Sequence, residues 1–316
     1  MIGMILGGLL MLSMIAFNSL GHSNQRAVLA PTQDHFPRLI ALEPTGVRLP
    51  ATPPPSSPTT TSEPHNRYVE IPVSSTPTPL ALSSKQQSEI LGFSTEGRPV
   101  ELYTFGTGSH ERMIVAGIHG GDEWNTVTLA NQLIKYVDRN PEIIPEEVTL
   151  YILPNLNPDG EVRAHNKYGR VNANGVDLNR NFPVNWQKEW DRGGCWNSLV
   201  TSGGTGPASE AETQALINFV ENHQIEVLIS YHSAALGVFP GGLPWEADSI
   251  RLAKSIADVS SYPFPPIDTG CKYSGTLADY AVSKGMAAVD LELTNHFDTD
   301  LDQNLDILNI LLSFVP

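Results

Sequence analysis

The stretch Met-Ile-Val-Ala-Gly-Ile-His-Gly-Gly-Asp-Glu-Trp, residues 113–124, constrains this chain most strongly. Its apolar run, residues 113–118, is short, partly β-branched and bounded by polar residues, which predicts a buried strand. Two glycines follow His119 and allow the backbone to turn sharply. His119 and Glu123 therefore leave the end of a sheet a few residues apart. Such a pair can hold a divalent metal, although a histidine at a strand end is more often a structural residue.

From Gln86 onward, strand-like runs alternate with helical patterns. The strand-like runs cover 148–153, 225–231 and 287–293, and the helical patterns cover 125–137, 209–221 and 301–314. This alternation predicts the α/β class, with a mixed, mostly parallel central β-sheet flanked by helices. Ligands collect at the carboxyl ends of the strands in such sheets, which is where His119 lies.

The N-terminal part differs in composition from the rest of the chain. Residues 1–17 are almost wholly apolar and carry no lysine or arginine, and Ser19 and Gly21 suit signal-peptidase cleavage after Gly21. The same run is long enough to remain as a single membrane anchor. Proline, serine and threonine then predominate, which disfavours folding. We expect a signal peptide or anchor (1–21), a Pro/Ser/Thr-rich linker (22–85) and a globular domain (86–316), exported and either secreted or held at the cell surface.

Charge and cysteine content exclude several classes of function. The formal net charge of −15 provides no electrostatic footprint for nucleic acid or anionic lipid. Two cysteines, Cys195 and Cys271, are too few for a disulfide framework or a cysteine-ligated zinc site. They can form one disulfide bridge in an exported protein.

For the oligomeric state of the protein, we expect a monomer.

Two further strand ends carry polar residues. His232 directly follows the run 225–231, and with His119 and Glu123 it completes the ligand set of an open catalytic zinc site. Glu292 is flanked by leucines, so we expect it to be partly buried and in need of a cation or a catalytic task, such as general base toward a water activated by zinc. A glutamate that faces solvent or forms a salt bridge is the alternative.

The segment 170–183 is the most distinctive in the chain. It is too polar for a core element, and its Asn179-Arg180 pair offers an amide and a planar fork for capture of a carboxylate. The alternative is an asparagine-rich surface loop with an arginine in a salt bridge. Asp159 and Asp177 are interpreted as loop residues that accept backbone hydrogen bonds.

Five motifs stand out along the domain: His119…Glu123, Asn-Pro-Asp-Gly at 157–160, Gly-Val-Asp-Leu-Asn-Arg-Asn-Phe at 175–182, Tyr-His-Ser at 231–233 and Leu-Glu-Leu at 291–293. They occur in the order seen in the zinc carboxypeptidases related to carboxypeptidase A, and from about Leu91 to its end the chain resembles a compact bacterial-type member of that family.

The resemblance implies a role for each matching residue. His119, Glu123 and His232 would bind one Zn²⁺ per chain, and Glu292 would be the general base. The substrate-facing residues would be Arg170 on the scissile carbonyl, Asn179 and Arg180 on the free C-terminal carboxylate of a peptide, and Tyr273 closing over the substrate.

Two departures from the family pattern leave alternatives open. Three residues rather than the usual two separate His119 from Glu123, so that Asp122 is an alternative ligand; Trp124 favours Glu123, because a similar residue commonly follows the family's glutamate. Tyr273 lies closer to Gly275 than expected and could instead be a core tyrosine.

The resemblance predicts a zinc metallocarboxypeptidase that hydrolyses the C-terminal peptide bond of peptides. An amidase or deacylase of the same fold, acting on muropeptides or acyl-amino acids, is the first alternative. An inactive peptide-binding module is the second.

Overall fold

A computed structural model describes residues 86–190, 199–268, 270 and 274–316. Several predictions fall outside these residues: the signal peptide or anchor (1–21), the linker (22–85), the bridge between Cys195 and Cys271, and the role of Tyr273. None of the helices in the described ranges combines the length and the apolar character needed to cross a membrane.

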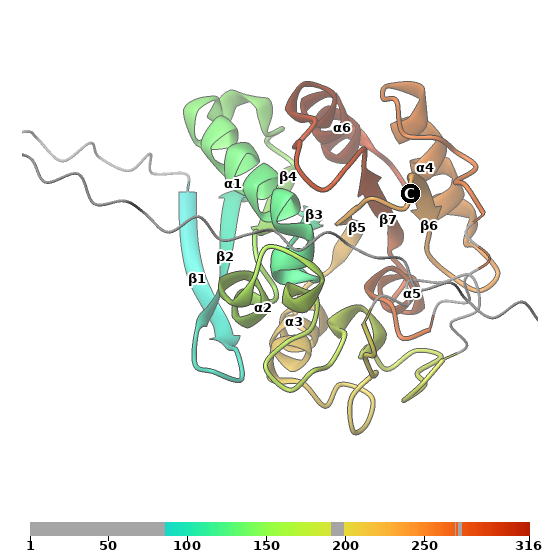
Figure 1. Ribbon diagram of the computed structural model, residues 1–316. Coiled ribbons are helices and arrows are strands. Elements are labelled where there is room, and N and C mark those ends of the chain that lie inside the picture. Colours follow the sequence, from blue (N-terminus) through green and yellow to red (C-terminus); the bar gives the residue numbers. More distant parts are fainter. Residues whose placement is uncertain (1–85, 191–198, 269, 271–273) are drawn as a thin grey trace, which may run out of the picture. The chain divides into compact units, whose positions relative to one another are not determined.

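The described domain is built on a seven-stranded mixed β-sheet with the order β1-β2-β4-β3-β5-β7-β6 (Figure 1). The four central strands β4, β3, β5 and β7 run parallel, whereas β1, β2 and β6 pair antiparallel at the two sides. The predicted α/β class with a mixed sheet is confirmed, and parallel pairing is confined to the centre. The strands are β1 (Gln86–Phe93), β2 (Pro99–Gly106), β3 (His110–Val115), β4 (Val148–Leu153), β5 (Ile225–Ser233), β6 (Gly237–Pro240) and β7 (Ala287–Leu293).

Helices cover both faces of the sheet. Helices α1 (Trp124–Arg139), α4 (Ala247–Asp258) and α6 (Leu301–Ser313) pack into one core, and α3 (Ala211–Glu221) and α5 (Leu277–Ser283) pack into the other. Neighbouring residues of β5 show the alternation: Ile229 belongs to the first core and Leu228 to the second. Full burial of one such side chain contributes about 1.5–3 kcal/mol.

Two strands differ from the sequence prediction in ways that affect the site. Strand β3 ends at Val115, three residues before the predicted end, so His119 lies in the loop that follows rather than directly at the strand end. Strand β5 extends to Ser233, because residues 230–233 pair with β7. His232 therefore projects from within a buried strand and lies opposite Glu292.

Short elements beyond the carboxyl ends of β3 and β4 pack closely against one another at glycine residues. They are the 3-10 helices η1 (Gly120–Glu123), η3 (Lys167–Gly169) and η4 (Leu178–Arg180), together with α2 (Pro158–Arg163); a further 3-10 helix, η2 (Pro141–Ile143), lies between α1 and β4. A Cβ atom on Gly121 would lie 2.1 Å from the Ala164 carbonyl oxygen, and one on Gly160 would lie 2.3 Å from the Gly169 oxygen. Gly120 has a φ of +46°. The glycines thus let the loop between His119 and Glu123 fold tightly against α2 and η3.

Candidate metal centre and active site

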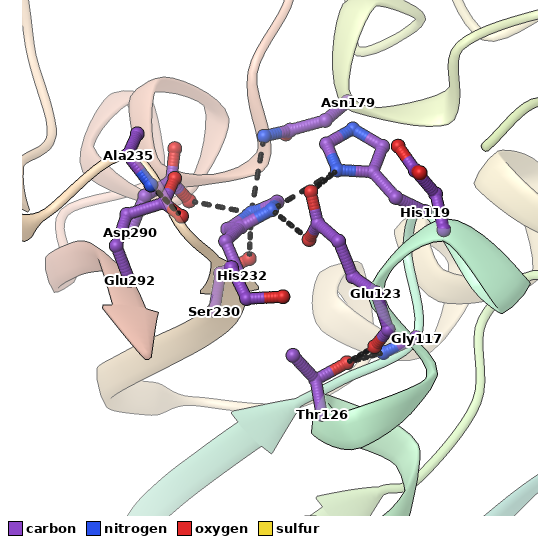
Figure 2. A network of polar contacts seen from close by, with 12 residues as sticks. Gly117, His119, Glu123, Thr126, Asn179, Ser230, His232, Ala235, Asp290 and Glu292 are labelled. Carbon is purple, nitrogen blue, oxygen red and sulfur yellow. Dashed lines mark hydrogen bonds and ion pairs between the residues drawn. The ribbon is translucent and has the colours of Figure 1, made fainter. Parts of the chain in front are cut away.

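Three buried side chains from two separate parts of the sheet converge on one point. His119 follows β3, Glu123 ends η1 and His232 lies on β5, and their relative exposures are only 3%, 3% and 2%. Glu123 Oε1 lies 2.8 Å from His119 Nδ1, and Glu123 Oε2 lies 3.1 Å from His232 Nδ1. One ligand atom from each residue falls within 4.8 Å of the others (Figure 2).

The donor atoms of this group fit a bound cation. His119 Nε2 lies 3.0 Å from a carboxylate oxygen of Asp177, so this nitrogen carries the proton and donates it. The lone pair of His119 Nδ1 then faces two atoms, Glu123 Oε1 and His232 Nδ1. A carboxylate cannot donate a hydrogen bond to a lone pair, so a cation or an additional proton must reconcile these atoms. Two imidazoles and one carboxylate are a common zinc ligand set.

The surroundings of His232 also favour positive charge at this point. Burial alone would lower the pKa of His232, but the carboxylates of Glu123 and Asp290 outweigh it and hold the pKa well above its ordinary value. The outer nitrogen of the ring, Nε2, lies 3.0 Å from Ser230 Oγ, 3.2 Å from Asn179 Nδ2 and 3.4 Å from Asp290 Oδ1. Ser230 Oγ and Asp290 Oδ1 can accept from this nitrogen and so fix the plane of the ring, as outer partners of metal-binding histidines do.

Asp177 links the metal group, defined here as His119, Glu123 and His232, to Arg170. One carboxylate oxygen of Asp177 contacts His119, and the other accepts from Arg170 Nε at 3.0 Å. Burial raises the pKa of the Asp177 carboxyl, but Arg170 and His119 outweigh this and hold the pKa well below its ordinary value. Asp177 also accepts from the Asn179 backbone N–H at 3.1 Å, as its predicted loop role requires. The sequence prediction missed the bridge to His119 and Arg170, because nothing in the local pattern places these residues together.

The structure also separates the two alternative ligands in the first motif. Glu123 belongs to the converging group, whereas Asp122 Oδ2 lies 3.8 Å from Arg170 Nη1. Arg170 Nη1 also donates to Glu123 Oε1 at 3.3 Å. The glycines of η1 therefore absorb the extra residue, and Asp122 becomes a charge partner of the arginine.

Glu292 lies beside this group on β7 and is half-buried. Its Oε2 atom accepts from the Ala235 backbone N–H at 2.9 Å (Figure 2). Burial raises the pKa of Glu292 to about 7; Glu123 and Asp290 add to the shift, while His232 and the Ala235 N–H oppose it. A carboxyl with such a pKa can both accept and donate a proton near neutral pH.

Asn179 and Arg180 lie on η4, next to the metal group. Asn179 Oδ1 accepts from the Leu277 backbone N–H at 2.8 Å, which directs its Nδ2 toward His232. Arg180 is 6% exposed, and its Nη1 donates to the Asn179 carbonyl oxygen at 2.7 Å. Burial raises the pKa of the nearby Asp279 carboxyl, and the positive charge of Arg180 opposes this shift. The structure thus brings together all the predicted site residues except Tyr273, which lies outside the described residues.

Comparison of the sequence with known proteins identifies the protein family that it matches. The family model described as zinc carboxypeptidase matches residues 83–296. Mast cell carboxypeptidase A of Rattus norvegicus is 29% identical over 230 residues, which cover 62% of this chain and 55% of that protein. Murein peptide amidase A of Escherichia coli K12 is 37% identical over 153 residues, which cover 46% of this chain and 58% of that protein. The chain therefore spans a little over half the length of these relatives.

Solved structures show the same fold. The murein-tripeptide amidase of Escherichia coli O157 superposes with a TM-score of 0.53 and 25% identity, covering 72% of this chain and 92% of that chain. Carboxypeptidase A of Helicoverpa armigera superposes with a TM-score of 0.55 and 20% identity, covering 71% of this chain and 66% of that chain. The family match and the His-Glu-His group confirm the predicted zinc cofactor. The chain belongs to the zinc carboxypeptidase family.

Proposed function

We propose that this protein is a zinc-dependent metallocarboxypeptidase that hydrolyses the C-terminal peptide bond of peptides. One observation carries the proposal: a buried arginine, Arg180, stands directly after the asparagine whose side-chain nitrogen lies 3.2 Å from His232 Nε2. A planar guanidinium beside a metal group is suited to bidentate capture of a carboxylate. Capture of a terminal carboxylate at Asn179 and Arg180 would present the last amide bond to the metal group.

Each residue of the site would then have its own role in the hydrolysis. A bound Zn²⁺ would supply Lewis acidity and make a water molecule more acidic. Glu292, oriented by the Ala235 N–H, would accept a proton from that water and return it to the departing amine. Arg170, held by Asp177 and Glu123, would stabilise the negative charge that develops on the carbonyl oxygen.

A second candidate is an amidase that acts on murein peptides. It is favoured by the similarity to murein peptide amidase A and by a superposition that covers 92% of the murein-tripeptide amidase chain. The third possibility, an inactive binding module, is disfavoured because Glu292 and Arg170 both lie beside the metal group. The two enzymatic candidates share the metal site and differ in substrate.

Hydrolysis of matched substrates by the zinc-loaded full chain tests the proposal. The panel consists of one peptide with a free C-terminus, the same peptide amidated, and a murein tripeptide. We expect cleavage of the free-carboxyl peptide only, and loss of that cleavage in Arg180→Met. Equal cleavage of the amidated peptide would overturn the carboxypeptidase proposal. Cleavage of the murein tripeptide alone would support the second candidate.

Export and a monomeric state are proposals that rest on the sequence alone. The apolar, uncharged run at residues 1–17 supports export, whether the segment is cleaved or kept as an anchor. Fractionation of producing cells, with the N-terminal sequence of the recovered protein, tests export and cleavage. The mass of the protein in solution tests the monomer.

A further inference from the structure

We propose that Asn125 is a positioning residue, which fixes the two zinc-ligand segments against the loop that follows the strand of the general base. The inference concerns zinc affinity as well as catalysis, and only its catalytic part rests on the proposed function. Asn125 is the second residue of α1 and follows Glu123 by two positions. Its relative exposure is 0%, so its polar atoms need partners within the protein.

The amide nitrogen of Asn125 connects α1 with the loop after β7. Nδ2 donates to the Asn295 carbonyl oxygen at 2.7 Å and to the Asp298 carbonyl oxygen at 2.9 Å. Both donor hydrogens of the amide are therefore used. The carbonyls belong to a turn that begins two residues after β7, the strand that carries Glu292.

The amide oxygen of Asn125 connects the same helix with β5. Oδ1 accepts from Ser233 Oγ at 2.9 Å, and Ser233 directly follows the zinc ligand His232. Ser233 Oγ also lies 3.2 Å from Nδ1 of His296, in the turn after β7. One side chain thus joins the segments that carry Glu123, His232 and Glu292.

The next residue, Thr126, links the end of η1 to the loop that precedes His119. Its hydroxyl donates to the Glu123 carbonyl oxygen at 2.8 Å and accepts from the Gly117 backbone N–H at 3.1 Å (Figure 2). Thr126 therefore holds η1 to the loop that leads to His119, whereas Asn125 holds the start of α1 to β5 and to the loop after β7. This function requires a side chain with two donors and an acceptor in one plane, and asparagine meets that requirement. Alanine would remove all three hydrogen bonds.

The test compares two buried asparagines, Asn125→Ala and the matched control Asn304→Ala. Asn304 is also 0% exposed, and its Nδ2 donates to Tyr262 Oη and to the carbonyl oxygens of Thr299 and Asp300. Zinc affinity is measured by competition with a chromophoric chelator, and thermal unfolding, kcat and KM are measured on the same full-length preparations. Metal affinity does not depend on substrate, so this readout can fail or succeed independently of the proposed peptidase activity.

We expect Asn125→Ala to weaken zinc binding about tenfold or more, as loss of an outer partner of a metal site commonly does. It should lower kcat more than it raises KM, whereas Asn304→Ala should lower the unfolding temperature and leave zinc affinity unchanged. Ser233→Ala removes one hydroxyl from the other end of the contact and provides a milder variant if Asn125→Ala does not fold. It should weaken zinc binding in the same direction and non-additively with Asn125→Ala. Wild-type zinc affinity in the Asn125 and Ser233 variants, or an equal loss in Asn304→Ala, would overturn the inference.

Discussion

The Nδ1 atoms of His119 and His232 lie 3.2 Å apart, although the two residues are separated by 113 positions in the sequence. Each of these nitrogens also lies close to a different oxygen of Glu123. Since Asp177 accepts a hydrogen bond from the outer N–H of His119, the inner nitrogen of the neutral ring carries no hydrogen. The site is therefore incomplete without a cation or an extra proton between its side chains.

Zinc should stabilise the folded protein measurably. Because the ligands come from the loop after β3, from η1 and from β5, the unfolded chain does not preserve their arrangement. Free Zn²⁺ at about a thousand times its dissociation constant should add about 4 kcal/mol to the free energy of unfolding. The unfolding temperature of zinc-loaded protein should fall by roughly 10 °C after chelation and should recover on adding zinc back. An unfolding temperature that is insensitive to chelation would contradict the metal assignment.

Asp177→Asn should weaken zinc binding without abolishing the fold. The substitution removes the negative charge that holds His119 and Arg170 together and leaves the size of the side chain unchanged. Loss of such an outer partner commonly costs about 10–100-fold in metal affinity. Chelator competition on wild type and variant provides the measurement, and unchanged affinity would show that Asp177 only holds its loop.

The sequence predicted the interior of the sheet better than its sides. Runs of mainly apolar residues identified β4 and β7 with their observed bounds, and both strands lie inside the sheet with a partner on each side. The edge strand β1 was missed, since Ile90 and Phe93 remain more than half exposed and its pattern is mixed. Burial and periodicity carry little information for a strand that has a partner on one side only.

The predicted metal ligands could be read from motifs, whereas their supporting residues could not. His119, Glu123 and His232 each lie next to a recognisable strand or turn. Asn125 bonds to Ser233, 108 positions away, and only the fold shows this contact. The sequence offered one signal for this role: Asn125 is a polar residue two positions after Glu123, on a helix with one buried apolar face.

Asp159→Asn should destabilise the protein at neutral pH and much less in acid. Asp159 accepts from Ser94 Oγ and Arg98 Nη1, each at 2.6 Å, and from the Glu96 backbone N–H at 3.0 Å. Burial raises its pKa, but these hydrogen bonds outweigh burial and lower the pKa below the ordinary value. The unfolded chain therefore binds the proton more readily, so the carboxylate stabilises the fold above the unfolded pKa of about 3.9 and stops doing so as pH falls through the folded pKa.

We expect a loss of about 2 kcal/mol in the free energy of unfolding at pH 7, typical of hydrogen bonds to a charged group. Urea titrations of wild type and Asp159→Asn between pH 7 and pH 3 should show the difference shrinking below about pH 4. A difference that stays constant over this range would show that the charge of Asp159 is not what matters.

Gly121→Ala should disturb the metal site through packing alone. The added methyl group would lie 2.1 Å from the Ala164 carbonyl oxygen, so η1 would have to move and carry Glu123 with it. We expect a loss of about 1–3 kcal/mol in the free energy of unfolding and weaker zinc binding. Gly206→Ala is the matched control, because its methyl group would meet nothing within 4 Å. Equal effects of the two substitutions on zinc affinity would rule out this explanation.

The most direct test of the account measures zinc content and peptide hydrolysis together in wild type and in Glu292→Gln. Glu292 lies opposite His232 in the sheet and outside the His-Glu-His group, so the amide should leave metal binding intact. We predict one zinc per chain in both proteins, hydrolysis of the free-carboxyl peptide by wild type, and a loss of about 10²–10⁴-fold in kcat in the variant. Wild-type hydrolysis by a zinc-loaded Glu292→Gln protein would contradict the assignment of Glu292 as the base, and wild type without zinc would contradict the metal centre.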